Sequence, residues 1–121
     1  MSDDFLKAAT KEIQEELDAL QKILRNCNND TDILYNGKEV QRHLHKIKGL
    51  APMMGQIDIG EIAKITDAVA RHVIADGALK ETLKNLLESN SVMRAILCDK
   101  YNGDIKEYKE KIKETFANVL K

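Results

Sequence analysis

The sequence predicts an all-α fold, an antiparallel up-and-down four-helix bundle with an additional C-terminal helix. Apolar residues recur at spacings of three and four along five stretches of the chain, which is the period of one face of a helix. No stretch has the alternating pattern of a strand, and the connections are short, which favours antiparallel neighbours. A chain of 121 residues can bury one core, so we expect a single domain over residues 1–121.

The first helix is expected from residue 2 to residue 27. Asparagine and aspartate residues at positions 26–30 end it, because their side chains compete for backbone hydrogen bonds. A short helical turn is an option at residues 31–35, and Asn36 and Gly37 add a second turn signal. The apolar face of this first helix consists of Leu6, Ala9, Ile13, Leu17, Leu20, Leu24 and Cys27.

The second and third helices are expected over residues 38–55 and 58–76. Gly55 is a suitable C-terminal cap for the second helix, because glycine adopts the left-handed conformation that ends many helices. At the start of the third helix, Asp58 and Glu61 have the spacing of a capping box.

The fourth helix is expected over residues 79–97, with a weak point at residues 89–91 where a kink or break is an option. A turn then leads to the last helix, over residues 104–119. Asp104 and Glu107 form a second capping-box pattern at its start.

The composition gives no sign of nucleic-acid binding, membrane insertion or export. Nineteen basic and 20 acidic residues leave a net charge of -1, which provides no overall field for nucleic acid or an anionic membrane. No apolar run approaches the ~20 residues that span a bilayer, and the N-terminal stretch is acidic where a signal peptide is basic. Cys27 and Cys98 form no C-x-x-C pair, and both fall on apolar helix faces, so we expect them in the core of a cytoplasmic protein.

The segment from His43 to Gly55 carries the candidate chemistry. Lys48 and Gly49 follow His45 by three and four positions and therefore share its helix face. An imidazole is nucleophilic near neutral pH, and a neighbouring lysine can offset charge on phosphoryl oxygens. Gly49 leaves room either for an approaching partner or for a neighbouring helix.

A metal site formed by His43 and His45 is not expected. Residues two apart on a helix point to nearly opposite sides, so these two imidazoles cannot hold one ion.

The segment from His45 to Gly49, with Ala51 and Gly55, resembles the H-x-(L/I)-K-G-x-A-x-x-x-G signature of histidine-containing phosphotransfer (HPt) domains. Residues 5–20 and 59–77 resemble the first and third helices of the N-terminal phosphoacceptor domain of chemotaxis histidine kinases. The resemblance therefore extends over most of the chain, although its specific residues lie between His45 and Gly55.

The resemblance implies a role for four residues. His45 is the phosphoacceptor, Lys48 is the neighbour of the phosphoryl group, and Gly49 is the small residue beside the imidazole. Asp67 is at the position of an acidic residue, usually glutamate, that hydrogen-bonds and orients the imidazole. Lys64 replaces a second histidine found in chemotaxis-type members, and it points either to the phosphate or to solvent.

The resemblance also implies a phosphoryl carrier rather than an enzyme. The expected partners are the catalytic domain of a histidine kinase and the receiver domain of a response regulator, and we expect a monomer. We expect no cofactor on this chain, because magnesium and ATP belong to the partner and no nucleotide motif is present. The alternative is a non-phosphorylated helical adaptor, and the chain is either free-standing or a piece of a kinase.

Overall fold

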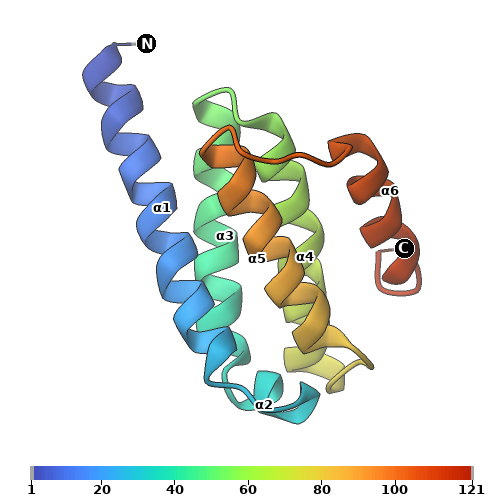
Figure 1. The fold of residues 1–121 in the computed structure, drawn as a ribbon. Helices are drawn as coiled ribbons and strands as arrows, with labels where there is room; N and C mark the ends of the chain where they lie inside the picture. Colours follow the sequence, from blue (N-terminus) through green and yellow to red (C-terminus); the bar gives the residue numbers. More distant parts are fainter. Residues whose placement is uncertain (1, 121) are drawn as a thin grey trace.

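The computed structural model describes residues 2–120, and all the regular secondary structure within them is α-helical, as predicted (Figure 1). The short helical turn anticipated near residues 31–35 is present as α2, which brings the total for this part of the chain to six helices. The helices are α1 (Asp3–Arg25), α2 (Asp30–Tyr35), α3 (Gly37–Met53), α4 (Ile57–Asp76), α5 (Thr82–Leu97) and α6 (Ile105–Thr115).

The four long helices α1, α3, α4 and α5 run side by side, and each is opposite in direction to the long helix before it (Figure 1). Helix α3 packs against α1 and α4, and α5 packs against the same two helices. The short α2 crosses the end of the molecule where α1 ends, and α6 packs on α4. None of the helices in residues 2–120 combines the length and the apolar character that a bilayer span requires.

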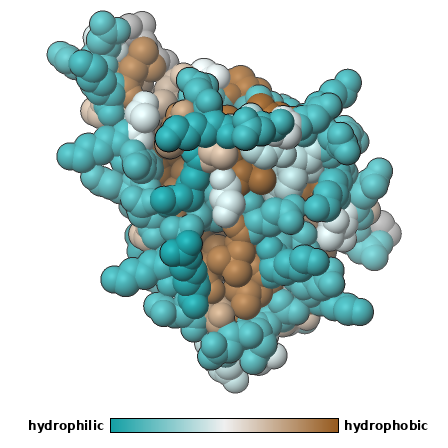
Figure 2. All heavy atoms as spheres, in the orientation of Figure 1, coloured by the Kyte–Doolittle hydropathy of each residue, from teal (hydrophilic) through white to brown (hydrophobic). Residues whose placement is uncertain are grey.

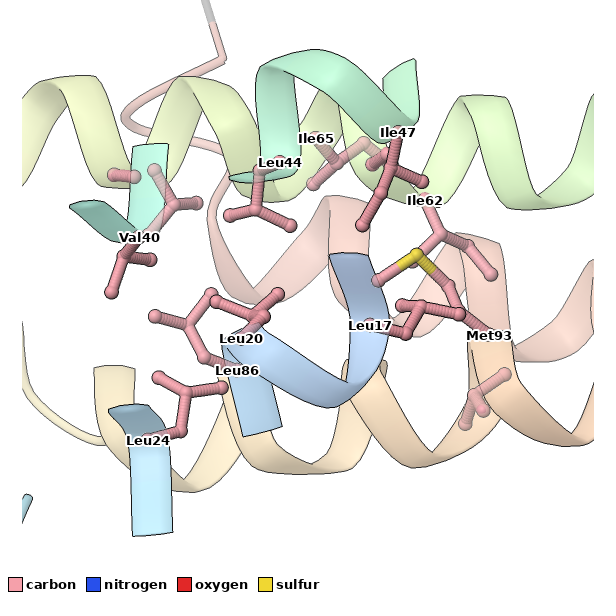
Figure 3. Close-up of a cluster of buried hydrophobic side chains, with 14 of the residues drawn as sticks. Leu17, Leu20, Leu24, Val40, Leu44, Ile47, Ile62, Ile65, Leu86 and Met93 are labelled. Carbon is pink, nitrogen blue, oxygen red and sulfur yellow. The ribbon is translucent and has the colours of Figure 1, made fainter. Parts of the chain in front are cut away.

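The predicted apolar faces meet in one hydrophobic core. Side chains from all four long helices point toward one another in Figure 3. The outer face in Figure 2 is largely hydrophilic around its margins and has a hydrophobic patch near its centre. Burying each leucine or isoleucine completely contributes about 1.5–3 kcal/mol relative to leaving it exposed. The labelled members of the cluster, all buried, are Leu17, Leu20, Leu24, Val40, Leu44, Ile47, Ile62, Ile65, Leu86 and Met93.

The end of α3 matches the prediction for Gly55. Its φ of 80° is the left-handed conformation, and its N–H donates to the carbonyl of Pro52. The N–H of Gln56 donates back to the carbonyl of Ala51 at 2.9 Å, which completes a Schellman motif. This tight stop turns the chain directly into α4, so the two helices that carry the candidate site are packed antiparallel.

The start of α5 differs from the prediction, because the helix begins at Thr82 and not at residue 79. The carboxylate of Asp30, in α2, accepts hydrogen bonds from the backbone N–H groups of Glu81 and Leu83, both at 2.8 Å. A distant residue therefore caps this helix. The anticipated weak point does not break α5, since Asn90 Nδ2 donates to the carbonyl of Leu17 in α1 and fixes the helix there.

The capping box expected from Asp58 and Glu61 is not formed. Helix α4 begins one residue earlier, at Ile57, and both carboxylates accept hydrogen bonds from Lys109 Nζ, at 2.7 and 2.8 Å. These bonds tie α6 to α4 and raise the pKa of Lys109 above its usual value. At α6 the prediction is correct for Asp104, whose side chain accepts from the N–H of Glu107.

The two cysteines differ in position. Cys27 is buried in the core, as predicted, whereas the prediction for Cys98 is wrong because this residue is exposed. Cys98 follows the last residue of α5 and belongs to a short exposed stretch, residues 98–100.

We expect Gly60→Ala to lower the free energy of unfolding by about 1–2 kcal/mol, because a Cβ at Gly60 would lie 2.8 Å from Cγ of the rigid Pro52 ring. Gly49→Ala is the control, since a Cβ there meets nothing within 4 Å and alanine favours a helix by about 0.5–1 kcal/mol. Urea denaturation measures both variants. Equal effects of the two substitutions would contradict the close α3–α4 contact.

Candidate functional site

His45 lies in the middle of α3 on the side that faces α4. Its side chain is 61% exposed, and its Nδ1 is 4.0 Å from Oδ2 of Asp67 in α4. Nδ1 is therefore the ring nitrogen that faces a carboxylate, and Nε2 is the nitrogen left for an incoming group. At 4.0 Å the hydrogen bond expected between Asp67 and His45 is not formed in this structure.

Asp67 is the centre of the polar contacts between α3 and α4. Its side chain is 2% exposed, and a buried carboxylate is stable only when it is hydrogen-bonded or paired with cations. Gln41 Nε2 donates to Oδ1 at 2.9 Å. Lys48 Nζ and an Arg71 guanidinium nitrogen both donate to Oδ2, at 3.3 and 2.6 Å. The structure thus brings together His45, Lys48 and Asp67 from two helices.

Two members of this cluster were not expected from the sequence. Gln41 precedes His45 by four residues and Arg71 follows Asp67 by four, so each shares a helix face with its neighbour. The i,i+4 pairing of aspartate and arginine is a signal that could have identified Arg71. Gln41 has no comparable signal, because its partner lies 26 residues away on another helix.

Gly49 faces open space. It is exposed, and a Cβ placed on it would meet no atom within 4 Å, which rules out the alternative that Gly49 admits a neighbouring helix. One turn beyond His45, the absence of a side chain leaves the helix surface accessible to a large partner. Met53, about two turns beyond His45, is 58% exposed and extends this accessible surface.

Lys64 precedes Asp67 by three residues on α4 but lies outside the cluster. It is exposed and lines a groove between α4 and α6 together with Ile65, Ala68 and Lys113. Among the described residues, Lys64 forms no ion pair with Asp67, whose cationic partners are Lys48 and Arg71.

His43 has a different environment from His45. It is buried and its Nδ1 contacts the carboxylate of Glu16 in α1, which also accepts from Lys46 Nζ at 3.3 Å. Burial alone would raise the pKa of Glu16, but the hydrogen bonds from His43 and Lys46 outweigh it and leave this pKa below its usual value. His43 thus joins α3 to α1, whereas His45 faces α4, which agrees with the prediction that they do not share a metal ion.

Within residues 2–120, no group of three or more histidine, cysteine or acidic side chains is arranged to hold a metal ion. No protein-family model matches this sequence, and searches of curated proteins and of solved structures find no significant match. The interpretation of the site therefore depends on its residues and their geometry.

We expect Asp67→Ala to lower the free energy of unfolding by about 2–3 kcal/mol, because it leaves Gln41, Lys48 and Arg71 without their shared acceptor. Glu39→Ala is the control, since it removes a carboxylate from an exposed ion pair with Arg42. Urea denaturation at pH 7 should show a much smaller loss for the control. A loss of similar size in both would show that the buried cluster does not stabilise α3 on α4.

The Glu16 contact should make stability depend on pH. The pKa of Glu16 is lower in the folded protein than its ordinary value of 4.5, so ionised Glu16 stabilises the fold above pH 4.5, and this contribution is lost as the pH falls through the folded value. Glu16→Gln should cost about 1–2 kcal/mol at pH 7 and progressively less below pH 4.5. Denaturation of both proteins across this range is the measurement, with Glu15→Gln as an exposed control; a difference that stays constant with pH would contradict the assignment.

Proposed function

We propose that this chain is an HPt domain that accepts a phosphoryl group on Nε2 of His45 and passes it to an aspartate of a receiver domain. The observation that carries the proposal is the exposed imidazole of His45 beside the buried, cation-paired carboxylate of Asp67. An exposed nucleophile suits a carrier that two partners reach in turn, and the neighbouring cations suit a group that brings negative charge.

The proposed transfer takes place in two steps, each of which forms one bond to phosphorus and breaks another. The lone pair of Nε2 attacks the γ-phosphorus of ATP bound to a kinase, the bond to the bridging oxygen breaks, and ADP leaves with those electrons. In the second step a carboxylate oxygen of the receiver attacks the phosphorus, and the electrons of the broken bond return to Nε2. The proton on Nδ1 stays on the ring throughout. Magnesium and nucleotide belong to the partners in this scheme, and the chain is a carrier, not an enzyme.

Each residue of the site has a role in this proposal. Asp67 faces Nδ1, which favours the tautomer that has its proton there and its lone pair on Nε2. Lys48 offsets charge on the phosphoryl oxygens. Gly49 and the exposed Met53 leave the surface beside His45 open to the partner.

The fold fits the same proposal. We interpret the four long helices as the up-and-down four-helix bundle typical of HPt domains, with α6 as the additional C-terminal helix. The resemblance of the sequence to the phosphoacceptor domain of chemotaxis histidine kinases supports this interpretation, and it favours a cytoplasmic relay with a monomeric carrier. The adaptor alternative keeps the same fold and the same docking surface without phosphorylation.

Phosphorylation of His45 is tested by incubating the chain with histidine kinase catalytic domains, ATP and magnesium. We expect an acid-labile, base-stable adduct on the wild type, which is lost when a receiver domain is added, and none on His45→Gln. Intact mass spectrometry measures both. His72→Gln is the matched control and should be labelled like the wild type, because His72 Nδ1 is also near a carboxylate, 3.4 Å from Asp76, but 30% exposed and outside the cluster.

Equal labelling of wild type and His45→Gln would show that His45 is not the acceptor. Failure of every kinase to label the chain, with receiver binding intact, would favour the adaptor.

A further inference from the structure

One oxygen of Asp67 has three candidate partners. Oδ2 accepts from Arg71 at 2.6 Å and from Lys48 at 3.3 Å, and Nδ1 of His45 lies 4.0 Å from the same atom. Two cations therefore occupy the acceptor that an Nδ1–H group would use. As long as both stay there, the imidazole is near the carboxylate but not hydrogen-bonded to it.

The other oxygen of Asp67 is held separately. Gln41 donates to Oδ1 at 2.9 Å from α3. The carboxylate therefore keeps one hydrogen bond and its orientation if the cations move. The cations are free to do so, since the side chains of Arg71 and Lys48 are 54% and 33% exposed, whereas that of Asp67 is 2% exposed.

We propose that Asp67 holds Arg71 and Lys48 beside His45 until a phosphoryl group arrives, when both cations turn to its oxygens and Oδ2 accepts a hydrogen bond from Nδ1–H of His45. This inference rests on the proposed function and adds Arg71 as a phosphoryl-binding residue and Asp67 as an acceptor that exchanges partners. The new bond is Nε2–P, formed by the ring lone pair, while the bond from phosphorus to the donor's leaving group breaks and that group departs with its electrons. The proton on Nδ1 stays on the ring.

The charges of the cluster support the exchange. Before transfer, two cations face a single carboxylate, so the site has an excess of positive charge. A phosphoryl group brings about two negative charges and three acceptor oxygens. The positive charges of Lys48, Arg71 and the protonated imidazole ring balance the negative charges of the phosphoryl group and of the Asp67 carboxylate. A guanidinium also matches phosphoryl oxygens with two parallel N–H groups, which makes Arg71 the better suited of the two cations.

Arg71→Gln tests the inference, with Arg42→Gln as the matched control. Arg42 precedes His45 by three residues on α3 and pairs with Glu39, not with Asp67, so its removal changes the same charge without touching the cluster. Each full-length protein is phosphorylated with phosphoramidate, a small donor that needs no docking surface. Intact mass gives the rate of labelling, and ³¹P and ¹H–¹⁵N NMR report on the phosphoryl group and on Nδ1–H.

We expect Arg71→Gln to slow the labelling of His45 about tenfold and to move the ³¹P resonance, while Arg42→Gln stays within about twofold of the wild type. Arg71→Lys should restore most of the rate, because it keeps the charge. Phosphorylation of the wild type should also protect Nδ1–H from solvent exchange. A merely structural role of Arg71 would not produce the ³¹P shift or the rescue by lysine.

Two results would overturn the inference. Labelling of His45 with the same rate and the same ³¹P shift in Arg71→Gln and Arg42→Gln would refute the role of Arg71 and leave the phosphoacceptor assignment intact. Failure of both phosphoramidate and kinases to label His45 in the wild type would refute the proposed function and this inference together.

Discussion

The buried carboxylate of Asp67 constrains the packing of α3 on α4. Taking an ionised carboxylate out of water costs several kcal/mol unless donors and cations surround it. Here they come from both helices, with Gln41 and Lys48 on α3 and Arg71 on α4. A shift of one helix along the other would leave Asp67 without two of its three partners. The same contacts that stabilise the interface therefore fix the position of His45 relative to α4.

Helix α3 faces a carboxylate on each of two sides. The two histidines concerned are two residues apart, so they point to nearly opposite sides of the helix. His43 is turned toward α1, where it meets Glu16, and His45 is turned toward α4, where it meets Asp67. Between these contacts, Leu44 and Ile47 are buried in the core. The first histidine is fixed in a buried contact, while the second is 61% exposed. Burial therefore distinguishes a structural histidine from an accessible one only two residues away.

Much of the fold could be predicted because it follows from local patterns. The apolar faces predicted for the long helices point into the core, and Gly55 ends α3 as expected. Two of the errors concern helix starts, where a distant residue determines the hydrogen bonds. Asp30, in α2, caps the start of α5. Lys109 donates to the carboxylates of Asp58 and Glu61, which therefore do not form the predicted capping box. A single sequence does not show which distant side chain reaches a helix end.

In the candidate site, too, the residues on one helix could be grouped from the sequence, whereas contacts between helices could not. His45, Lys48 and Gly49 are placed by the period of one helix, so the sequence could group them. The inclusion of Asp67 depended on a family resemblance, and Gln41 was missed because its contact with Asp67 crosses between helices. Lys64 likewise lies outside the cluster because it lines the groove between α4 and α6, and a contact between helices is not visible in the sequence.

The open site is consistent with the proposed role as a phosphoryl carrier, and it limits what the chain can contribute to the transfer reaction. His45 is on the convex surface of a helix, next to a glycine that faces open space. A surface of this kind excludes little water, so it cannot supply the closed, low-dielectric surroundings in which enzymes stabilise a transition state most strongly. It does allow a donor and an acceptor of different shapes to reach the same nitrogen in turn. On the proposed function, the chain therefore contributes the nucleophile, its tautomer and two nearby cations, and the docked partner completes the rest of the reaction centre.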